Sequence, residues 1–272
     1  MDRKLLQYLV EYLVEEGKAH GCALPPAAAD AAQGGLASAS TEALWLAFRS
    51  LVNVRPPWPA PGEFLATQDE LLQGLIAEAG VATLADTTPS PTDPRLRLWR
   101  GDITTLAADA IVNAANSGMT GCWAPLHYCI DNAIHTFAGV QLRAACANLM
   151  AAQGHPEPTS QAKATDGYNL PARYVIHTVG PIANGRPTDT HRRQLAECYR
   201  ACLDATAKAG LSSIAFCCIS TGVFGFPQEE AASIAVATVR RWLNEHPDVP
   251  MTVVFNVFSE TDESLYRPLL GL

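Results

Sequence analysis

The chain is short of positive charge and of long apolar runs. Its 19 lysines and arginines stand against 27 aspartates and glutamates, which leaves a net charge of −8 over 272 residues. Such a balance argues against broad attraction to nucleic acid, so any anionic ligand must be held locally. No apolar run is long enough to span a membrane. Residues 1–16 carry charges throughout and lack the apolar block of a secretory signal, so we expect a cytoplasmic protein.

Cysteine is too sparse for a disulfide-stapled scaffold. Eight cysteines are too few for a scaffold held together by disulfides, such as small secreted domains use. Cys217 and Cys218 are adjacent in an apolar run, and Cys198 and Cys202 lie at helical spacing. These four side chains are predicted to be reduced thiols within a core.

The first part of the chain has the patterns of helices. Residues 1–16 are predicted to form an amphipathic helix, residues 23–40 an Ala-, Pro-, Gly- and Ser-rich loop, and residues 41–52 a second helix. The sequence at 67–70 is a capping-box pattern, which predicts the start of a third helix. Gly80 is the expected end of that helix.

A change of pattern near residue 90 predicts two parts. Three prolines between Thr87 and Pro94 interrupt regular structure and predict a domain boundary, with a helical N-terminal extension at 1–90 and a second domain at 91–272. Within the second domain short β-rich segments alternate with helical ones, which is typical of an α/β sheet covered by helices. Strands are expected at 95–101, 109–114, 173–179, 212–219 and 251–258, and helices near 130–150, 190–209 and 228–245.

A glycine-bearing turn follows the strand expected at 212–219. Gly222 and Gly225 permit tight backbone turns, so that successive N–H groups can point at one anion before a helix begins at Gln228. By itself this pattern is equally typical of an ordinary turn. It lacks the lysine of a nucleotide-hydrolase phosphate loop and the glycine spacing of a dinucleotide-binding fold.

Cys122, His127 and Cys129 form a C-x4-H-x-C pattern. Two thiolates and an imidazole suit Zn²⁺, and three protein ligands leave a fourth tetrahedral position for water or substrate, as in catalytic zinc sites. The alternative is a pair of core thiols beside a loop histidine. Asp131 follows two residues later, at the start of a predicted helix.

Six motifs, taken together and in this order, resemble the macrodomain family. They are Gly101–Thr104, Asp109–Asn116, Ile130–Gly139, Gly167–Pro171, Tyr174–Pro181 and Ser220–Pro227. The resemblance covers about residues 95–260 and implies a three-layer α/β/α sandwich with a mixed central sheet. It also implies an ADP-ribose cleft across the strand ends.

One departure from the familiar macrodomain pattern points to a particular branch. Where hydrolytic macrodomains usually carry a glycine run, this chain has residues 122–131, which resemble the zinc-containing branch of the family. Members of that branch also carry a helical N-terminal extension and remove ADP-ribose from modified proteins. The resemblance therefore implies one Zn²⁺ per chain, held by Cys122, His127 and Cys129.

The resemblance also assigns roles at the distal ribose. Asp131 corresponds to the family carboxylate that orients or deprotonates the attacking water, although an acid at a helix N-terminus can simply interact with the helix dipole. Asn116 corresponds to the amide near the distal ribose, and Cys129 is expected to border the same ligand. Asn132 either caps the helix or contacts the ribose, and Asn113 is expected to tie the strand end to neighbouring backbone.

The rest of the ligand is assigned in the same way. Asp102 corresponds to the acid that accepts a hydrogen bond from the adenine amino group, and the Ile103 backbone corresponds to the group that contacts the neighbouring ring nitrogen. Phe258 is a candidate for stacking on adenine. His135 and His177 lie in apolar runs and are predicted to be structural histidines whose ring nitrogens have hydrogen-bond partners. The residues expected to wrap the diphosphate are Ser220, Thr221, Gly222, Val223 and Phe224, the last also packing on ribose.

The predicted function is zinc-dependent removal of mono-ADP-ribose from proteins modified through an oxygen of Ser, Asp or Glu. Two alternatives remain open: a reader module that binds ADP-ribose without cleaving it, and a hydrolase of free ADP-ribose derivatives. The expected partners are ADP-ribose and a mono-ADP-ribosylated protein, and in the resembled branch they can include a sirtuin-like ADP-ribosyltransferase. No nucleic acid or membrane partner is expected.

Overall fold

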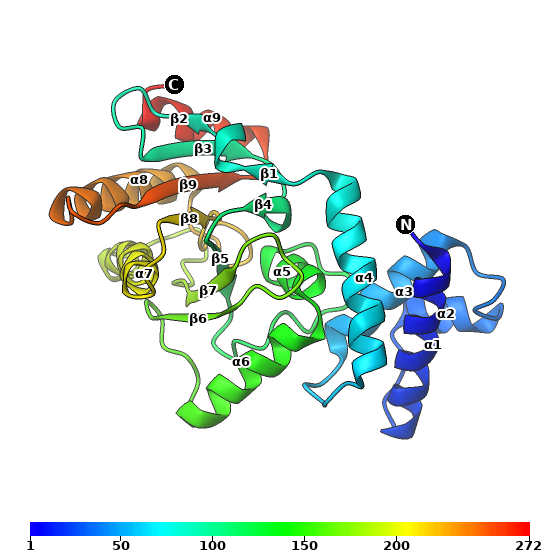
Figure 1. Ribbon diagram of the computed structural model, residues 1–272. Coiled ribbons are helices and arrows are strands. Elements are labelled where there is room, and N and C mark those ends of the chain that lie inside the picture. Colours follow the sequence, from blue (N-terminus) through cyan, green and yellow to red (C-terminus); the bar gives the residue numbers. More distant parts are fainter.

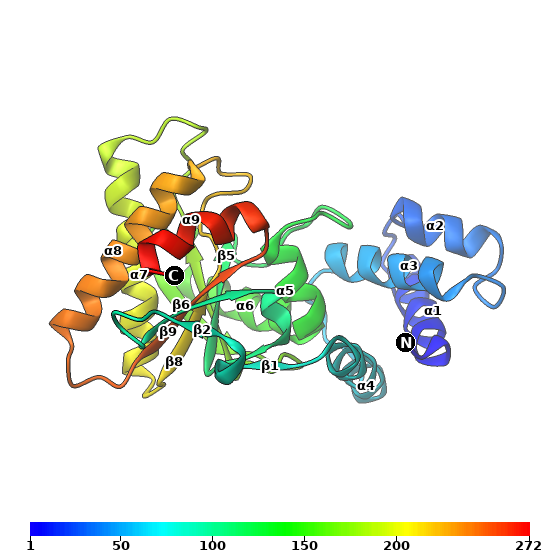
Figure 2. The ribbon, with the colours of Figure 1, turned by 90° about the horizontal axis from the view of Figure 1, so that it is seen from above.

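The computed structural model describes residues 1–272, with four N-terminal helices beside a layered α/β region (Figure 1). The N-terminal helices are α1 (Arg3–Ala19), α2 (Pro26–Gln33), α3 (Thr41–Val54) and α4 (Gly62–Ala79). Figure 2 shows α1, α2 and α3 grouped at one end of the molecule, next to α5 (Ile130–Ala138) and away from the C-terminal helices. The predicted helices at 1–16 and 41–52 are confirmed.

A seven-stranded mixed sheet forms the centre of the second region, in the order β2-β3-β9-β8-β5-β7-β6. Its five inner strands are parallel, and the edge strands β2 and β6 pair antiparallel to their neighbours. The strands are β2 (Thr88–Pro89), β3 (Leu96–Arg100), β5 (Ala110–Ala115), β6 (Ala162–Asp166), β7 (Tyr174–Val179), β8 (Ser213–Phe216) and β9 (Thr252–Val257). Two short strands, β1 (Ala82–Thr83) and β4 (Leu106–Ala107), form a separate parallel pair.

Helices cover both sides of this sheet. One group, α5 with α6 (Val140–Gln153), contacts β5 and β6, and a second group contacts β3, β6, β7, β8 and β9. The second group comprises α7 (Asp189–Lys208), α8 (Gln228–Glu245) and α9 (Glu260–Leu270). The central strands β5, β7, β8 and β9 are buried along almost their whole length because helices cover both faces, as expected of parallel sheets, whereas β3 alternates buried and partly exposed residues. The predicted α/β class with a mixed sheet between helices is confirmed.

The N-terminal helices have an apolar core of their own. Leu6, Leu9 and Leu13 recur at helical spacing on α1 and are buried against α3 and α4. Val140 at the start of α6 belongs to this core, and Phe137 on α5 packs against it and against the sheet core. The two cores therefore meet at α5 and α6.

Three local predictions were wrong. The segment 23–40 contains α2, because Pro26 stands at the first helical position, where its fixed φ favours a helix, and alanines follow. Thr67 does not cap a helix: α4 begins earlier, and the Thr67 hydroxyl donates to the Glu63 carbonyl inside it. The helix expected at 130–150 is divided at Gly139, whose φ of 95° ends α5.

Other predictions agree more closely with the structure. Gly80 ends α4 as predicted. The thiols of Cys198, Cys202 and Cys217 are free and buried, and Cys218 is partly buried. The domain boundary stays a prediction, although β1 and β2 already pair with strands beyond residue 90. None of the helices combines the length and the apolar character needed to cross a bilayer.

Candidate active site

The predicted site residues lie at one edge of the sheet, where the parallel strands have their carboxyl ends. Asp102 lies just beyond β3, Phe258 just beyond β9, the segment 220–227 beyond β8, and Asn116 just beyond β5. Ligands of open α/β sheets bind outside this edge. β5 and β8 are paired only through Ala110–Ile111, so the two strands are no longer joined where β5 reaches the edge.

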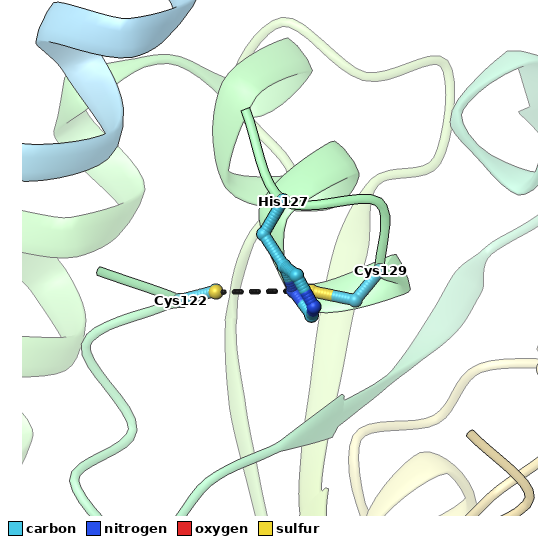
Figure 3. A group of neighbouring side chains, drawn as sticks. All are labelled: Cys122, His127 and Cys129. Atoms are coloured by element: carbon cyan, nitrogen blue, oxygen red, sulfur yellow. Dashed lines mark hydrogen bonds between the residues drawn. The ribbon is translucent and has the colours of Figure 1, made fainter. Parts of the chain in front are cut away.

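The segment Cys122–Cys129, which we call the metal loop, brings its three predicted ligands together (Figure 3). The Cys122 sulfur lies 3.5 Å from Nδ1 of His127. The donor atoms of Cys122, His127 and Cys129 all lie within 4.8 Å of one another, and the three residues are partly buried. Cys129 also caps α5, since its sulfur accepts a hydrogen bond from the Asn132 N–H at 3.5 Å.

The chemistry of these donors fits a zinc ion. Burial, with a smaller effect from the nearby Cys122, raises the pKa of the Cys129 thiol to about 12. A bound cation replaces such protons, because the thiolate is the form that ligates metal. Two sulfurs and one imidazole are a donor set that zinc prefers, and these three residues would hold the ion.

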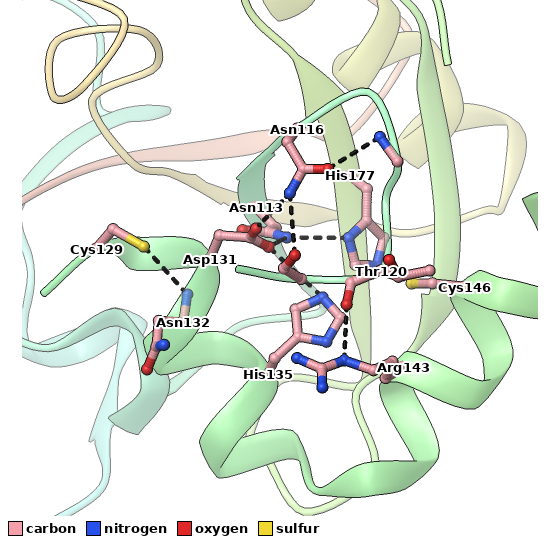
Figure 4. Close-up of polar contacts among 12 residues, drawn as sticks. Asn113, Asn116, Thr120, Cys129, Asp131, Asn132, His135, Arg143, Cys146 and His177 are labelled. Carbon is pink, nitrogen blue, oxygen red and sulfur yellow. Dashed lines mark hydrogen bonds and ion pairs between the residues drawn. The ribbon is translucent and has the colours of Figure 1, made fainter. Parts of the chain in front are cut away.

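Asp131 lies in a polar network at the end of β5 (Figure 4). Asn113 Nδ2 donates to its Oδ1 at 2.8 Å, and Asn116 Nδ2 donates to its Oδ2 at 3.3 Å. Asp131 is only 5% exposed, and burial raises its pKa to about 6 despite these hydrogen bonds. The structure thus brings together Asp131 and Asn116, the two residues predicted to act at the distal ribose.

Two neighbouring asparagines differ from their predictions. Asn113 bonds the Asp131 side chain and lies 3.2 Å from His177 Nδ1, whereas neighbouring backbone was expected as its partner. Its sequence signal was a polar residue inside an otherwise apolar buried strand. Asn132 is fully buried, and its Nδ2 donates to the Ala124 carbonyl at 3.2 Å, so its side chain braces the metal loop.

The two buried histidines have different surroundings. His177 is a structural histidine, as predicted, with Nε2 at 2.9 Å from the Thr165 hydroxyl and 3.7 Å from the Cys146 sulfur. Burial lowers its pKa to about 4. His135 is equally buried, but neither ring nitrogen has a hydrogen-bond partner, so the prediction that it is satisfied was wrong. Its Nε2 lies 3.5 Å from Oδ1 of Asp131, and one ring nitrogen lies within 4.8 Å of the Cys146 sulfur and of a His177 ring nitrogen.

The segment after β8 has the features of an anion-binding loop. The N–H groups of Gly222, Val223 and Phe224 donate to no protein acceptor. Ser220 adopts a φ of 67°, and its buried hydroxyl has no hydrogen-bond partner. The Phe224 carbonyl accepts from two backbone N–H groups of the 183–184 segment, at 2.8 and 3.0 Å, which fixes the loop. Free N–H groups on a fixed loop suit a diphosphate.

The adenine end of the predicted ligand lies at the surface. Asp102 is exposed and caps a short 3-10 helix, Ile103–Thr105, accepting hydrogen bonds from the Thr104 N–H and hydroxyl at 2.9 and 2.7 Å. Phe258 is 60% exposed and contacts the ring of Tyr128, with 5.9 Å between ring centroids. The metal loop therefore reaches Phe258 at the same edge of the sheet.

Comparison with known proteins agrees with this arrangement. The family model for the Macro domain matches residues 112–235. A protein of Treponema medium named protein-ADP-ribose hydrolase is 52% identical over 97% of both chains. The chain belongs to the macrodomain family. A Staphylococcus aureus protein of the same name is 50% identical to this macrodomain protein over 85% of the chain and 86% of the relative.

Solved macrodomains share the fold. The Trypanosoma brucei macrodomain in complex with ADP-ribose has a TM-score of 0.63 at 33% identity, covering 82% of this chain and 95% of that one. The Oceanobacillus iheyensis macrodomain with ADP has a TM-score of 0.59 at 42% identity, covering 65% of this chain and 90% of that one. The macrodomain architecture predicted from the sequence is thereby confirmed.

Proposed function

We propose that this macrodomain protein is a zinc-dependent protein-ADP-ribose hydrolase that releases mono-ADP-ribose from an oxygen of Ser, Asp or Glu. The observation that carries the proposal is the grouping of the Cys122, His127 and Cys129 donors two residues before a buried Asp131. The names of relatives that align over nearly the whole chain support the hydrolase activity. The donor set supports the metal.

Binding of ADP-ribose is assigned to the carboxyl edge of the sheet. The free N–H groups at 222–224 would hold the diphosphate, together with Ser220 and Thr221. Asp102 and Ile103 would recognise adenine, and the exposed Phe258 ring would stack on it. Solved macrodomains with ADP-ribose or ADP support this placement.

The reaction breaks the bond between the anomeric carbon of the distal ribose and the acceptor oxygen. Bound zinc would supply a Lewis acid at Cys122, His127 and Cys129. Asp131 would take a proton from the attacking water as the water oxygen bonds to the anomeric carbon and the bond to the acceptor oxygen breaks. A Ser oxygen would take a proton from solvent water as it leaves, an Asp or Glu acceptor would leave as a carboxylate, and Asp131 would then release its proton to solvent. Positive character develops on the sugar in such cleavage, so an ionised carboxylate also stabilises it.

Asn113 and Asn116 position the carboxylate for this step. Each donates one amide N–H to a different oxygen of Asp131, which fixes the plane of the carboxylate. A raised pKa near 6 makes Asp131 a stronger base than an ordinary carboxylate while it remains largely ionised at neutral pH. The cytoplasmic location and a partnership with a sirtuin-like ADP-ribosyltransferase stay predictions.

Turnover and metal content test the proposal directly. A mono-ADP-ribosylated protein labelled on the adenosine would be incubated with the enzyme as purified, after chelation and after zinc is restored. We expect one zinc per chain, release of intact ADP-ribose by mass, loss of turnover on chelation and recovery with zinc. Binding of ADP-ribose with no label released under any metal condition would make the protein a reader module.

A matched variant separates the metal from the fold. Cys122→Ser should lose zinc and turnover, whereas Cys22→Ser, at an exposed cysteine of the N-terminal extension, should keep both. Release of phosphate or an acyl group from free ADP-ribose derivatives, without action on modified protein, would favour a hydrolase of metabolites.

A further inference from the structure

Asn53, near the end of α3, lies between the N-terminal extension and the metal loop. Its side chain is 1% exposed. Oδ1 accepts a hydrogen bond from the Leu126 N–H at 2.9 Å, and Nδ2 donates to the Thr136 hydroxyl on α5 at 3.2 Å. A buried amide with both polar atoms bonded has one orientation, so the Leu126 N–H is held at one place.

The backbone conformation of Leu126 is unusual for a leucine. Its φ is 58°, in the left-handed region that residues other than Gly, Asn and Asp rarely adopt. It directly precedes the ligand His127. Relaxation of Leu126 to a common φ would turn the peptide that carries His127, and the imidazole would leave the two sulfurs.

A second set of contacts links the end of α3, through Arg143, to Thr120, two residues before the metal loop, and to Trp123 within it. Arg143 on α6 is 4% exposed and donates to the Thr120 carbonyl at 2.7 Å. The same guanidinium donates to the carbonyls of Val52 and Arg55, at 3.0 and 2.7 Å, at the end of α3. It also lies 4.3 Å from the centroid of the Trp123 ring.

We propose that Asn53 is a positioning residue, contributed by the N-terminal extension, which holds the metal loop in the conformation that groups Cys122, His127 and Cys129. This inference rests on the proposed function and gives the extension a part in it. The extension is then required for the metal site, since without α3 this chain loses the side-chain acceptor of the Leu126 N–H.

Three substitutions separate positioning from packing. Asn53→Ala removes both side-chain bonds of Asn53. Thr136→Val removes the bond from Asn53 to α5, together with the bond that the Thr136 hydroxyl donates to the Asn132 carbonyl, and keeps the acceptor for Leu126. Asn53→Asp keeps an acceptor oxygen toward the loop. Full-length protein would be loaded with zinc, and transfer of zinc to a chromogenic chelator would be followed. The absorption spectrum of the cobalt-loaded protein would report the ligand geometry.

We expect Asn53→Ala to weaken zinc binding by about tenfold or more, the usual effect of removing a group that orients a metal ligand. Thr136→Val should keep the wild-type affinity, even with a comparable loss of thermal stability, and Asn53→Asp should recover most of it. Equal zinc affinity in wild type and Asn53→Ala, or equal losses in Asn53→Ala and Thr136→Val, would overturn the proposal.

Hydrogen exchange keeps this test separate from the test of zinc dependence. In metal-free protein we expect Asn53→Ala to speed exchange of the amides at 126–129 by about tenfold, with little change in Thr136→Val. If wild type binds no zinc, the proposed function fails, while faster exchange in Asn53→Ala still supports the positioning of the loop. Unchanged exchange in Asn53→Ala would overturn it.

Discussion

Asp131 is the residue on which the proposed chemistry depends most. Its carboxylate is buried and bonded by two asparagine amides, so it is fixed before substrate binds. A fixed group needs less reorganisation when the reaction begins. The cost is a raised pKa, because burial disfavours the charged form.

Asp131→Asn should abolish most turnover while ADP-ribose binding persists. The amide has the size of the carboxylate but cannot accept the proton of water, and loss of a general base lowers kcat by about 10²- to 10⁴-fold. The thermal midpoint at pH 8 should not fall, since the variant lacks a buried charge. Single-turnover kinetics, calorimetric titration and a melting curve measure the three effects, and wild-type kcat in this variant would exclude the assigned role.

His177 makes the stability of the fold depend on pH. Burial lowers its pKa from 6.5 to about 4, so the folded protein resists a proton that the unfolded chain accepts. The stabilisation is complete above pH 6.5 and is lost as the pH falls through 4. The difference of pKa corresponds to about 3 kcal/mol. The neighbouring His135, also of lowered pKa through burial, acts in the same direction.

His177→Gln should flatten this dependence. Urea unfolding of wild type and variant between pH 7 and pH 4 gives the free energy of unfolding at each pH. We expect the wild type to lose up to about 3 kcal/mol more than the variant over this range. Parallel curves for the two proteins would show that His177 is not the titrating group.

At the scale of elements, the loop after β8 depends on the strand beside it. Gly180 follows β7, and a Cβ built there would lie 2.1 Å from the Ser220 hydroxyl and 2.9 Å from Cγ2 of Ile219. Only glycine therefore lets the turn at Ser220, with its φ of 67°, approach β7 so closely.

Gly180→Ala should weaken ADP-ribose binding by about tenfold or more, because Ser220 must shift and the N–H groups at 222–224 move with it. Gly74→Ala on α4 is the matched control, since no atom lies within 4 Å of its Cβ position. Calorimetric titration with ADP-ribose compares the two variants. Unchanged affinity in Gly180→Ala would mean that the loop adapts.

At the scale of the whole molecule, the N-terminal helices and the sheet region are joined by buried polar contacts. Arg143 satisfies two carbonyls at the end of α3, whose C-terminal dipole favours a cation. The two apolar cores also meet at Val140 and Phe137. We therefore expect the two parts to unfold together.

Arg143→Ala should weaken this coupling. It leaves three carbonyls without their donor, which we expect to lower the free energy of unfolding by about 3 kcal/mol. Urea unfolding followed by both tryptophan fluorescence and circular dichroism should give coincident transitions for wild type. Separate transitions in wild type would contradict the single cooperative unit.

The sequence alone was enough to predict those helices and strands whose pattern lies within a few neighbouring residues. The amphipathic repeat of α1, the stop at Gly80 and the alternation after Arg95 come from periodicity and turn chemistry within a few residues. The ligand pattern at Cys122–Cys129 was visible for the same reason, since its three donors are close in the chain.

Tertiary structure decided what depends on residues far apart in the chain. Asn53 and Leu126 are 73 positions apart, and Asn113 and Asp131 are 18 apart. No local pattern predicts such partners, because folding over long separations sets them. The sequence by itself determined which groups are present and the class of fold. The packing of α3 and α5 at the end of the sheet decided which of those groups meet, since a buried polar side chain can bond only the groups that face it.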